Sequence, residues 1–149
     1  MKCLFGIPVL IVGSLVTSPA LASDLIVSRA ILEDVSSALT IADVAGRVTI
    51  PAGSTLSMNS TSSVHWICLR VRAPATGGKL VLFIRPTYLN ELRLYQAGSG
   101  NPLTWKTRVT GNPYPYANRG RPNISLGFVV KVAAPEATFY LRLKTRSPA

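Results

Sequence analysis

The sequence predicts an all-β domain, a β-sandwich or jelly roll, preceded by a signal peptide and a short helical turn. Three observations predict this fold. Apolar and polar residues alternate with a period of two in several short segments, Gly- and Pro-containing turn signals separate those segments, and helical character is confined to one stretch. A parallel α/β sheet is excluded, because the helices that connect parallel strands are missing.

The first 22 residues have the three parts of a secretion signal. Lys2 supplies a positive start, residues 4–16 form an apolar run, and residues 20–22 (Ala-Leu-Ala) have the small-x-small pattern of a cleavage site. The alternative is an uncleaved membrane anchor, but these 13 residues are fewer than the roughly 20 that a helix needs to cross a bilayer. We therefore expect export, cleavage after Ala22, and then a flexible segment at residues 23–30.

The mature chain is long enough for one domain. Removing residues 1–22 from the 149 residues leaves 127, and we expect the domain at residues 31–146 and a short tail at residues 147–149. Cys68 is the only cysteine after the signal, so no intramolecular disulfide can form. Its place in an alternating apolar segment predicts a buried side chain rather than a reactive thiol. We expect no metal and no cofactor, because the chain offers one Cys, one His and no clustered carboxylates.

The secondary-structure elements follow from this pattern in order. Residues 37–45 are the stretch with helical character, and Gly46 would end it. At least seven strands are expected, near residues 47–50, 66–72, 79–85, 91–95, 103–109, 124–132 and 139–144. In most of these strands one face is apolar, and the other face should expose basic or aromatic side chains.

The charge of the chain is strongly positive. The formal net charge is +10, and it falls to +9 when Lys2 is removed with the signal. From Arg47 onward 14 Lys or Arg residues face only two acids, Glu91 and Glu136, which favours anionic partners. Nucleic acid is not expected as a partner, because the protein is exported and its basic residues are dispersed along strands. A solvated basic face near an anionic membrane is the simplest interpretation.

Catalysis is not expected. His65 is the only histidine, and a general base needs a nucleophile and an orienting acid beside it. The chain has too few acidic residues to supply convincingly the pair of catalytic carboxylates that a glycosidase uses. We therefore expect a binding protein and not an enzyme.

The best candidate for recognition is the loop at residues 112–119. Tyr114, Tyr116, Asn118 and Arg119 offer rings that can stack on a sugar and polar groups that can orient its hydroxyls. The alternative is that the prolines of this loop hold an extended crossover while the tyrosines cover the edge of the sheet.

Three further residues are candidates for ligand contacts. Trp66 could stack on a ligand, although packing in the core or at an edge is the simpler explanation. Arg70 and Arg85, with Arg142, could bind an anion through paired hydrogen bonds. These arginines could equally be solvated charges that prevent the edge of the sheet from pairing with the edge strand of another molecule.

Several segments, in this order and spacing, resemble a known module. They are residues 31–36 with the acidic Leu-Glu-Asp step, 39–44, the tryptophan-led strand at 65–71, 80–95, then Thr110-Gly111-Asn112, Arg119 and 139–144. Together they resemble the second type of extracellular domain of bacterial seven-transmembrane receptors with diverse intracellular signalling modules, the DISM family. One departure is Asn112, because the family often has an acid after the glycine.

The resemblance covers residues 31–146 and implies a function. It implies a jelly roll related to carbohydrate-binding modules, in the periplasm of a Gram-negative bacterium. Its role would be to sense a carbohydrate or another small polar or anionic solute and to signal to a membrane partner. In the family, seven membrane helices and an output domain follow, and we expect no membrane span here after the signal is cleaved. One expectation is that the chain is truncated from a sensor diguanylate cyclase or histidine kinase. The alternative is a free-standing module that docks to a membrane receptor or to the envelope.

Overall fold

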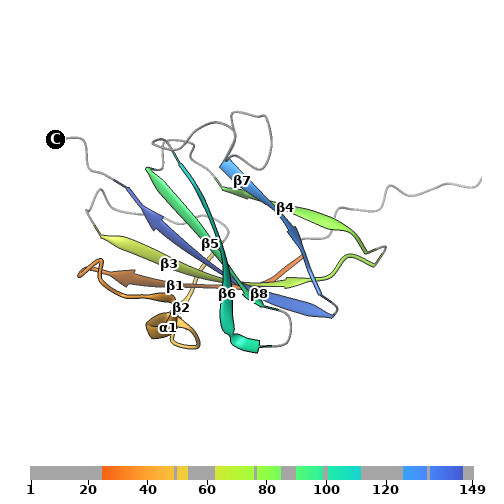
Figure 1. The fold of residues 1–149 in the computed structure, drawn as a ribbon, viewed down its shortest axis with the longest axis horizontal. Coiled ribbons are helices and arrows are strands. Elements are labelled where there is room, and N and C mark those ends of the chain that lie inside the picture. Colours follow the sequence, from red (N-terminus) through yellow and green to blue (C-terminus); the bar gives the residue numbers. More distant parts are fainter. Residues whose placement is uncertain are drawn as a thin grey trace, which may run out of the picture.

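The computed structural model describes residues 25–48, 50–53, 63–75, 77–84, 90–98, 101–111, 126–133 and 135–145. The predicted signal peptide, the C-terminal tail, Arg85 and the loop candidates Tyr114, Tyr116, Asn118 and Arg119 lie outside the described residues. Within the described ranges the chain forms two antiparallel sheets and one short helix, so the predicted all-β sandwich is confirmed (Figure 1).

The larger sheet has six antiparallel strands in the order β2-β1-β3-β8-β5-β6. Their bounds are β1 (Ile26–Asp34), β2 (Ile50–Pro51), β3 (Val64–Arg72), β5 (Glu91–Gly98), β6 (Asn101–Thr110) and β8 (Glu136–Lys144). The centre of this sheet is the pair β3 and β8, which stay in register from Val64 opposite Lys144 to Arg72 opposite Glu136.

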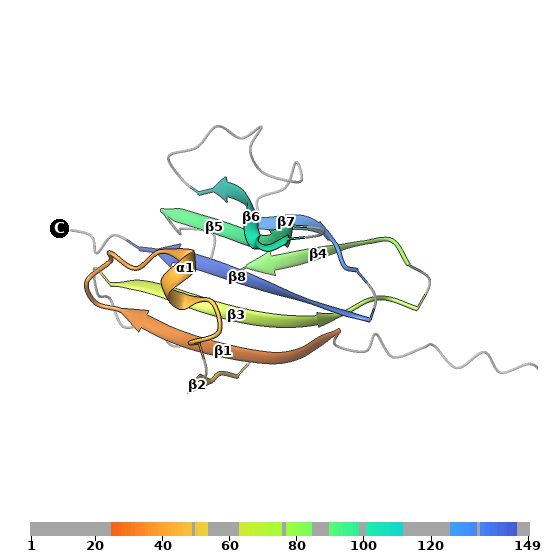
Figure 2. The ribbon, with the colours of Figure 1, turned by 60° about the horizontal axis from the view of Figure 1, so that its bottom comes forward.

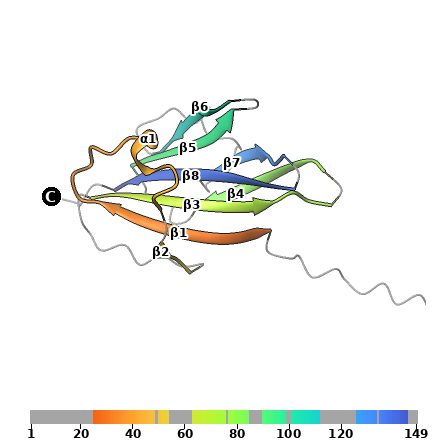
Figure 3. The same cartoon turned by 90° about the horizontal axis from the view of Figure 1, so that it is seen from below.

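The smaller sheet is the antiparallel pair β4 (Lys79–Ile84) and β7 (Leu126–Lys131). It covers one side of the larger sheet, and α1 (Ile41–Val44) lies on the other side (Figure 1, Figure 2). Seen from below, the strands of the larger sheet run side by side from β2 and β1 across to β5 and β6 (Figure 3). The larger sheet is therefore the middle layer, with the small sheet on one face and the segment that contains α1 on the other.

The main core lies between the two sheets. Leu69 of β3 is paired with Phe139 of β8, and this inner face packs against Phe128 of β7. The buried members of this core are Ile67, Leu69, Val71, Leu82, Leu92, Leu94, Phe128, Val130, Val132, Phe139, Leu141 and Leu143. The period-two alternation of the strands produces this core, because it places every second side chain on the same face.

A second core lies on the opposite face of the larger sheet, where the sequence predicted exposed basic and aromatic side chains. Its buried members are Val44, Val48, Val64, Trp66 and Tyr140. The cover segment, residues 35–48, lies over this face, and the backbone N–H of Gly46 donates a hydrogen bond to the Tyr140 hydroxyl at 3.0 Å. This part of the face is therefore a packed interior and not a solvated surface.

The structure corrects the N-terminal part of the prediction. Residues 26–30 belong to β1, which pairs with β3 from Ile26 opposite Val71 to Asp34 opposite Val64, so they are not a flexible segment before the domain. The short helical turn expected within residues 37–45 is confirmed as α1, which is four residues long. The strand expected at residues 47–50 is reduced to β2, which contacts β1 at two positions at the edge of the sheet.

Candidate functional site

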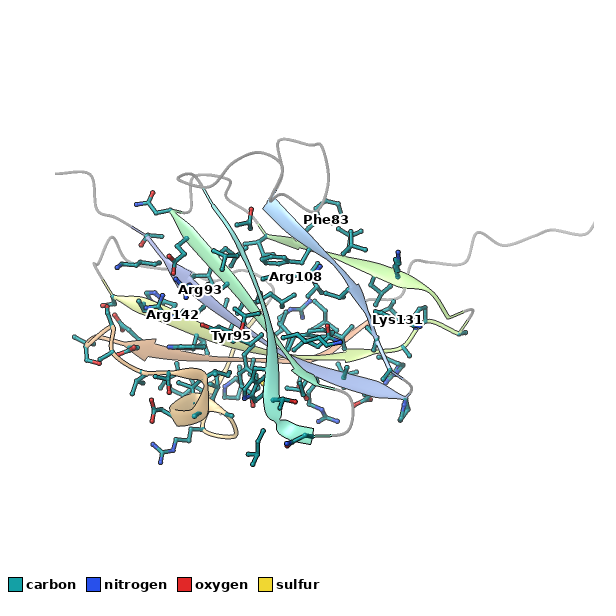
Figure 4. All side chains as sticks on the ribbon, in the orientation of Figure 1. Phe83, Arg93, Tyr95, Arg108, Lys131 and Arg142 are labelled. Carbon is teal, nitrogen blue, oxygen red and sulfur yellow. The ribbon has the colours of Figure 1, made fainter. Side chains whose placement is uncertain are left out.

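The first group of functional side chains surrounds Glu91 on the face of the larger sheet that carries α1. We call Glu91, Arg93 and Arg142 the Glu91 cluster. Arg93 of β5 stands directly opposite Arg142 of β8, and the two like charges would repel each other without a partner. Figure 4 labels both arginines on these neighbouring strands.

The carboxylate of Glu91 offsets this repulsion by accepting hydrogen bonds from both arginines. Nη1 of Arg142 lies 2.9 Å from Oε1 of Glu91, and Nε of Arg93 lies 2.8 Å from the same oxygen. A longer bond of 3.3 Å joins Nη2 of Arg93 to Oε2 of Glu91. The side chains of Glu91 and Arg142 are only 18% and 15% exposed, so water screens their attraction weakly.

Arg142 also contacts the cover segment. Its Nη2 donates to the backbone carbonyl of Ser37 at 3.5 Å, and its guanidinium lies 6.0 Å from the ring centre of Trp66. The backbone of Ser37 has a φ of 57°, which directs the chain out of β1 and over the sheet. Arg142 was predicted to lie on an exposed strand face, but the structure instead uses it to hold the cover segment.

Trp66 is fully buried, which supports the packing alternative and leaves no exposed ring face for a ligand. Its ring lies 5.5 Å from that of Tyr95, and Trp105 makes an edge contact with Tyr140 at 5.6 Å. Tyr95 and Trp105 are partly exposed, so they are the rings of this face that a solute could reach. Tyr95 was missed as a candidate, although it lies on a strand that the sequence predicted.

Asp34 ends β1 and organises the start of the cover segment. Its carboxylate accepts hydrogen bonds from the Ser36 hydroxyl at 2.6 Å and from the Leu39 backbone N–H at 3.0 Å. Burial alone would raise the pKa of Asp34, but these hydrogen bonds and a backbone bond from Ser37 outweigh it, so the pKa lies below the usual 3.8. The Trp66 indole N–H contributes to the same lowering, although it does not reach full hydrogen-bond geometry. Asp34 is therefore an ionised anchor for the cover.

Cys68 lacks the properties of a reactive thiol. Burial raises its pKa above the usual 9.0, and this outweighs the hydrogen bond with Tyr140 and the nearby charge of Arg70. A thiol with a raised pKa is rarely ionised at neutral pH. The predicted packing role holds in part, since the side chain is half-buried and borders the second core.

Arg70 has an acidic partner. Its Nη2 lies 2.8 Å from Oε2 of Glu136, and the two side chains are 55% and 29% exposed. The guanidinium is accessible, so a ligand could reach it, but would compete with Glu136. The structure does not bring Arg70 together with the Glu91 cluster, because the two ion pairs lie at different positions along β8.

The second group of polar side chains lies where β6 approaches β7, on the side of the larger sheet that carries the small sheet. We call this place the β6/β7 edge. The guanidinium of Arg108 lies 5.3 Å from the ring centre of Phe128, and Nε2 of Gln96 donates to the backbone carbonyl of Lys131 at 3.0 Å. Figure 4 labels Arg108 and Lys131. Sequence reasoning missed Arg108 and Gln96. One sequence signal could have identified Arg108. Within a predicted strand, every second residue is polar or charged at Lys106, Arg108 and Thr110, which places these side chains on one face.

His65 is buried in β3 opposite Glu33 and Leu143. Across the described ranges, no three His, Cys, Asp or Glu side chains are grouped so that they could hold a metal ion.

Comparison with known proteins finds one family. The model of the family described as 7TMR-DISM extracellular 2 matches residues 28–149, which confirms the resemblance expected from the sequence. No curated protein matches the chain. None of the helices in the described ranges is both long and apolar enough to cross a membrane.

Proposed function

Because this chain belongs to the 7TMR-DISM extracellular 2 family, we propose that it is a periplasmic sensor domain that binds a carbohydrate or another small polar or anionic solute. The observation that carries this proposal is the family match over residues 28–149, since the family consists of extracellular domains of seven-transmembrane receptors. The two-sheet sandwich supports it, because such folds place loops and strand edges where a solute can bind.

The mechanism that we propose is a shift between conformations. A solute that binds one arrangement of the domain more tightly than another raises the population of that arrangement, and a membrane partner responds to the change. The bond between Arg142 and the Ser37 carbonyl supports such a mechanism, because it connects the centre of the sheet to the cover segment. No reaction on the solute is part of the proposal.

The output of the signal is proposed from the family as well. We propose that the domain belongs to a receptor of a Gram-negative bacterium whose intracellular part is a diguanylate cyclase or a histidine kinase. The DNA downstream of the codon for Ala149 tests this. An open frame that encodes seven apolar segments and an output domain would support it, and a stop codon without an adjacent gene for a membrane protein would contradict it.

The test of solute binding is a thermal-shift screen of the purified protein. The panel contains neutral sugars, acidic sugars and sugar phosphates at millimolar concentrations. A ligand that binds the folded state raises the melting temperature in a concentration-dependent way. The double variant Tyr114→Ala with Tyr116→Ala tests the predicted loop and should reduce the shift, whereas Lys79→Ala is a surface control that should not. The absence of a shift with every solute would contradict the proposal.

A second function is favoured by the outer face of the small sheet. Phe83 of β4 is 55% exposed and stands opposite Gly127 of β7, and Lys79 is paired with Lys131 at the other end of the same face. An exposed ring with two lysines fits a free-standing module that docks to a membrane receptor or to the envelope. Stable co-purification with a membrane protein, lost in Phe83→Ser, together with no response to solutes, would favour this function over the first.

A further inference from the structure

The positive charge of the domain is unevenly compensated between the two faces of the larger sheet. Glu91 and Glu136 are the only acids after Arg47, and both are engaged on the face that carries α1. Glu91 accepts from two arginines there, and Glu136 is paired with a third. The other described acids, Glu33, Asp34 and Asp43, belong to β1 and the cover segment, and β1 lies near the opposite end of the larger sheet from β6. None of the ion pairs among the described residues involves Lys106 or Arg108.

The register of β5 and β6 brings three polar side chains together at this edge. Gln96 stands directly opposite Lys106, and Arg108 is the next residue of β6 on the same face. Direct cross-strand neighbours have Cβ atoms about 5 Å apart and diagonal neighbours about 7–8 Å apart, which long side chains can bridge. Lys106 and Arg108 are both exposed, so a solute can reach them.

Arg108 is oriented by its surroundings. The guanidinium lies 5.3 Å from the ring centre of Phe128, an arrangement that favours the cation and restricts its motion. Although the residue as a whole is exposed, neighbouring atoms partly desolvate the guanidinium and lower its pKa from the ordinary value. It remains charged at neutral pH, because a guanidinium does not lose its proton in proteins.

Gln96 is held in place as well. Its Nε2 donates to the Lys131 carbonyl, which leaves the side-chain carbonyl as an acceptor for a hydroxyl group. Further along the same face of β6, the hydroxyl of Thr110 is fully buried and has no hydrogen-bond partner among the described residues. The β6/β7 edge thus combines an oriented cation, a second cation and a fixed amide.

We propose that Arg108, Lys106 and Gln96 form a binding site for the oxyanion group of a small solute. The oxyanion is a carboxylate or a phosphate, which a guanidinium binds through two parallel hydrogen bonds, and Lys106 adds a second positive charge. Gln96 orients a neighbouring hydroxyl of the solute. This inference rests on the proposed sensing function and specifies that the sensed solute is anionic, such as an acidic sugar or a sugar phosphate.

The test uses three probes that share one sugar ring. Glucose, glucuronate and glucose 6-phosphate differ in the group attached at C5 of the ring, which is neutral, a carboxylate or a phosphate ester. Binding to the purified protein is measured by calorimetry at 20 mM and 200 mM NaCl. We expect at least one of the anionic probes to bind and glucose to bind at least tenfold more weakly, and we expect the affinity for the anion to fall as salt rises.

Variants locate the site. Arg108→Gln should weaken the binding of the anion about tenfold or more, and Arg108→Lys should weaken it less, since it keeps the charge but loses the paired geometry. Arg72→Gln removes one exposed positive charge from the other face and should leave the affinity within about twofold of the parent. A thermal melt of each variant without probe checks that it folds, which we expect because Arg108 is exposed on an edge strand.

The outcomes separate this inference from the proposed function. Equal binding of the anion by the parent and Arg108→Gln would overturn the site while leaving an anion sensor in place. Binding of glucose alone would overturn the inference and support the proposed function. The failure of every solute in the wider thermal-shift panel would contradict both.

Discussion

Replacing Glu91 by Gln should destabilise the domain by about 2 kcal/mol, because it removes the carboxylate that Arg93 and Arg142 share. The change is nearly isosteric, so the effect comes from charge. Hydrogen bonds to charged groups contribute about 1.5–3 kcal/mol when they are shielded from water, and breaking a shielded pair also leaves the remaining charges without compensation. Arg93 and Arg142 would then face each other directly across β5 and β8.

The matched control is Glu136→Gln. This substitution breaks the ion pair between Glu136 and Arg70. The N–O distance of this pair is 2.8 Å, and that of the pair between Arg142 and Glu91 is 2.9 Å, so the two pairs have equally good geometry. The side chains of the control pair are 55% and 29% exposed, however, and those of Arg142 and Glu91 are 15% and 18% exposed. An exposed pair contributes about 0–1 kcal/mol, so the two substitutions should differ by more than about 1 kcal/mol.

The assay is urea unfolding followed by tryptophan fluorescence, with the midpoint and slope fitted for the parent and both variants. A loss of about 2 kcal/mol corresponds to a fall of roughly 8 °C in melting temperature for a domain of this size. Equal losses in the two variants, or a loss below about 0.5 kcal/mol for Glu91→Gln, would refute the argument from burial. Raising the salt concentration should reduce the effect of Glu136→Gln more than that of Glu91→Gln.

Three further changes test how the cover segment and the strand ends are held. The folded pKa of Asp34 lies below 3.8, so its contribution to stability is present above pH 3.8 and is lost as the pH falls through the folded pKa. Asp34→Asn should therefore flatten the stability profile below about pH 4 in urea titrations, and profiles of equal slope would contradict this. Tyr140→Phe removes the hydroxyl that accepts from the Gly46 N–H and should cost about 1 kcal/mol in the same unfolding assay, and a neutral result would show that this bond does not hold the cover. Gly111→Ala should lower the melting temperature by several degrees, because Gly111 has a φ of 146° and an added Cβ would lie 2.3 Å from the backbone oxygen of Asn90. An unchanged melting temperature would mean that the end of the strand adapts to the added methyl group.

Strands that have one apolar and one polar face could be located from the sequence. The alternation in residues 79–85 and 139–144 placed β4 and β8 at nearly their observed positions. β1 was missed, because apolar side chains on both of its faces pack partly against a core and its apolar residues therefore do not alternate. Ile31 packs toward the main core and the adjacent Leu32 toward the second core, so the two are apolar neighbours. A strand covered on both faces loses the period-two signal.

The candidate site could be predicted only in part, because the sequence pattern does not show which face of a strand is covered by another segment. Sequence patterns identified Trp66 and Arg142 as lying on the face opposite the main core, and the register confirms it. They could not show that residues 35–48 cover that face, since this depends on contacts such as that between Gly46 and Tyr140, which are 94 positions apart. The accessibility of both side chains is set by this cover.

The sequence by itself therefore determined the all-β class, the family and the excess of positive charge, because composition, local period and the order of motifs are properties of the chain alone. Only the tertiary structure decided which arginines are paired with the two acids of the sheet region, and which of them remain at the β6/β7 edge. The physical reason is that an ion pair needs two side chains within about 4 Å. Strand register and the choice of covered face bring Arg142 to Glu91 and leave Arg108 beside Phe128.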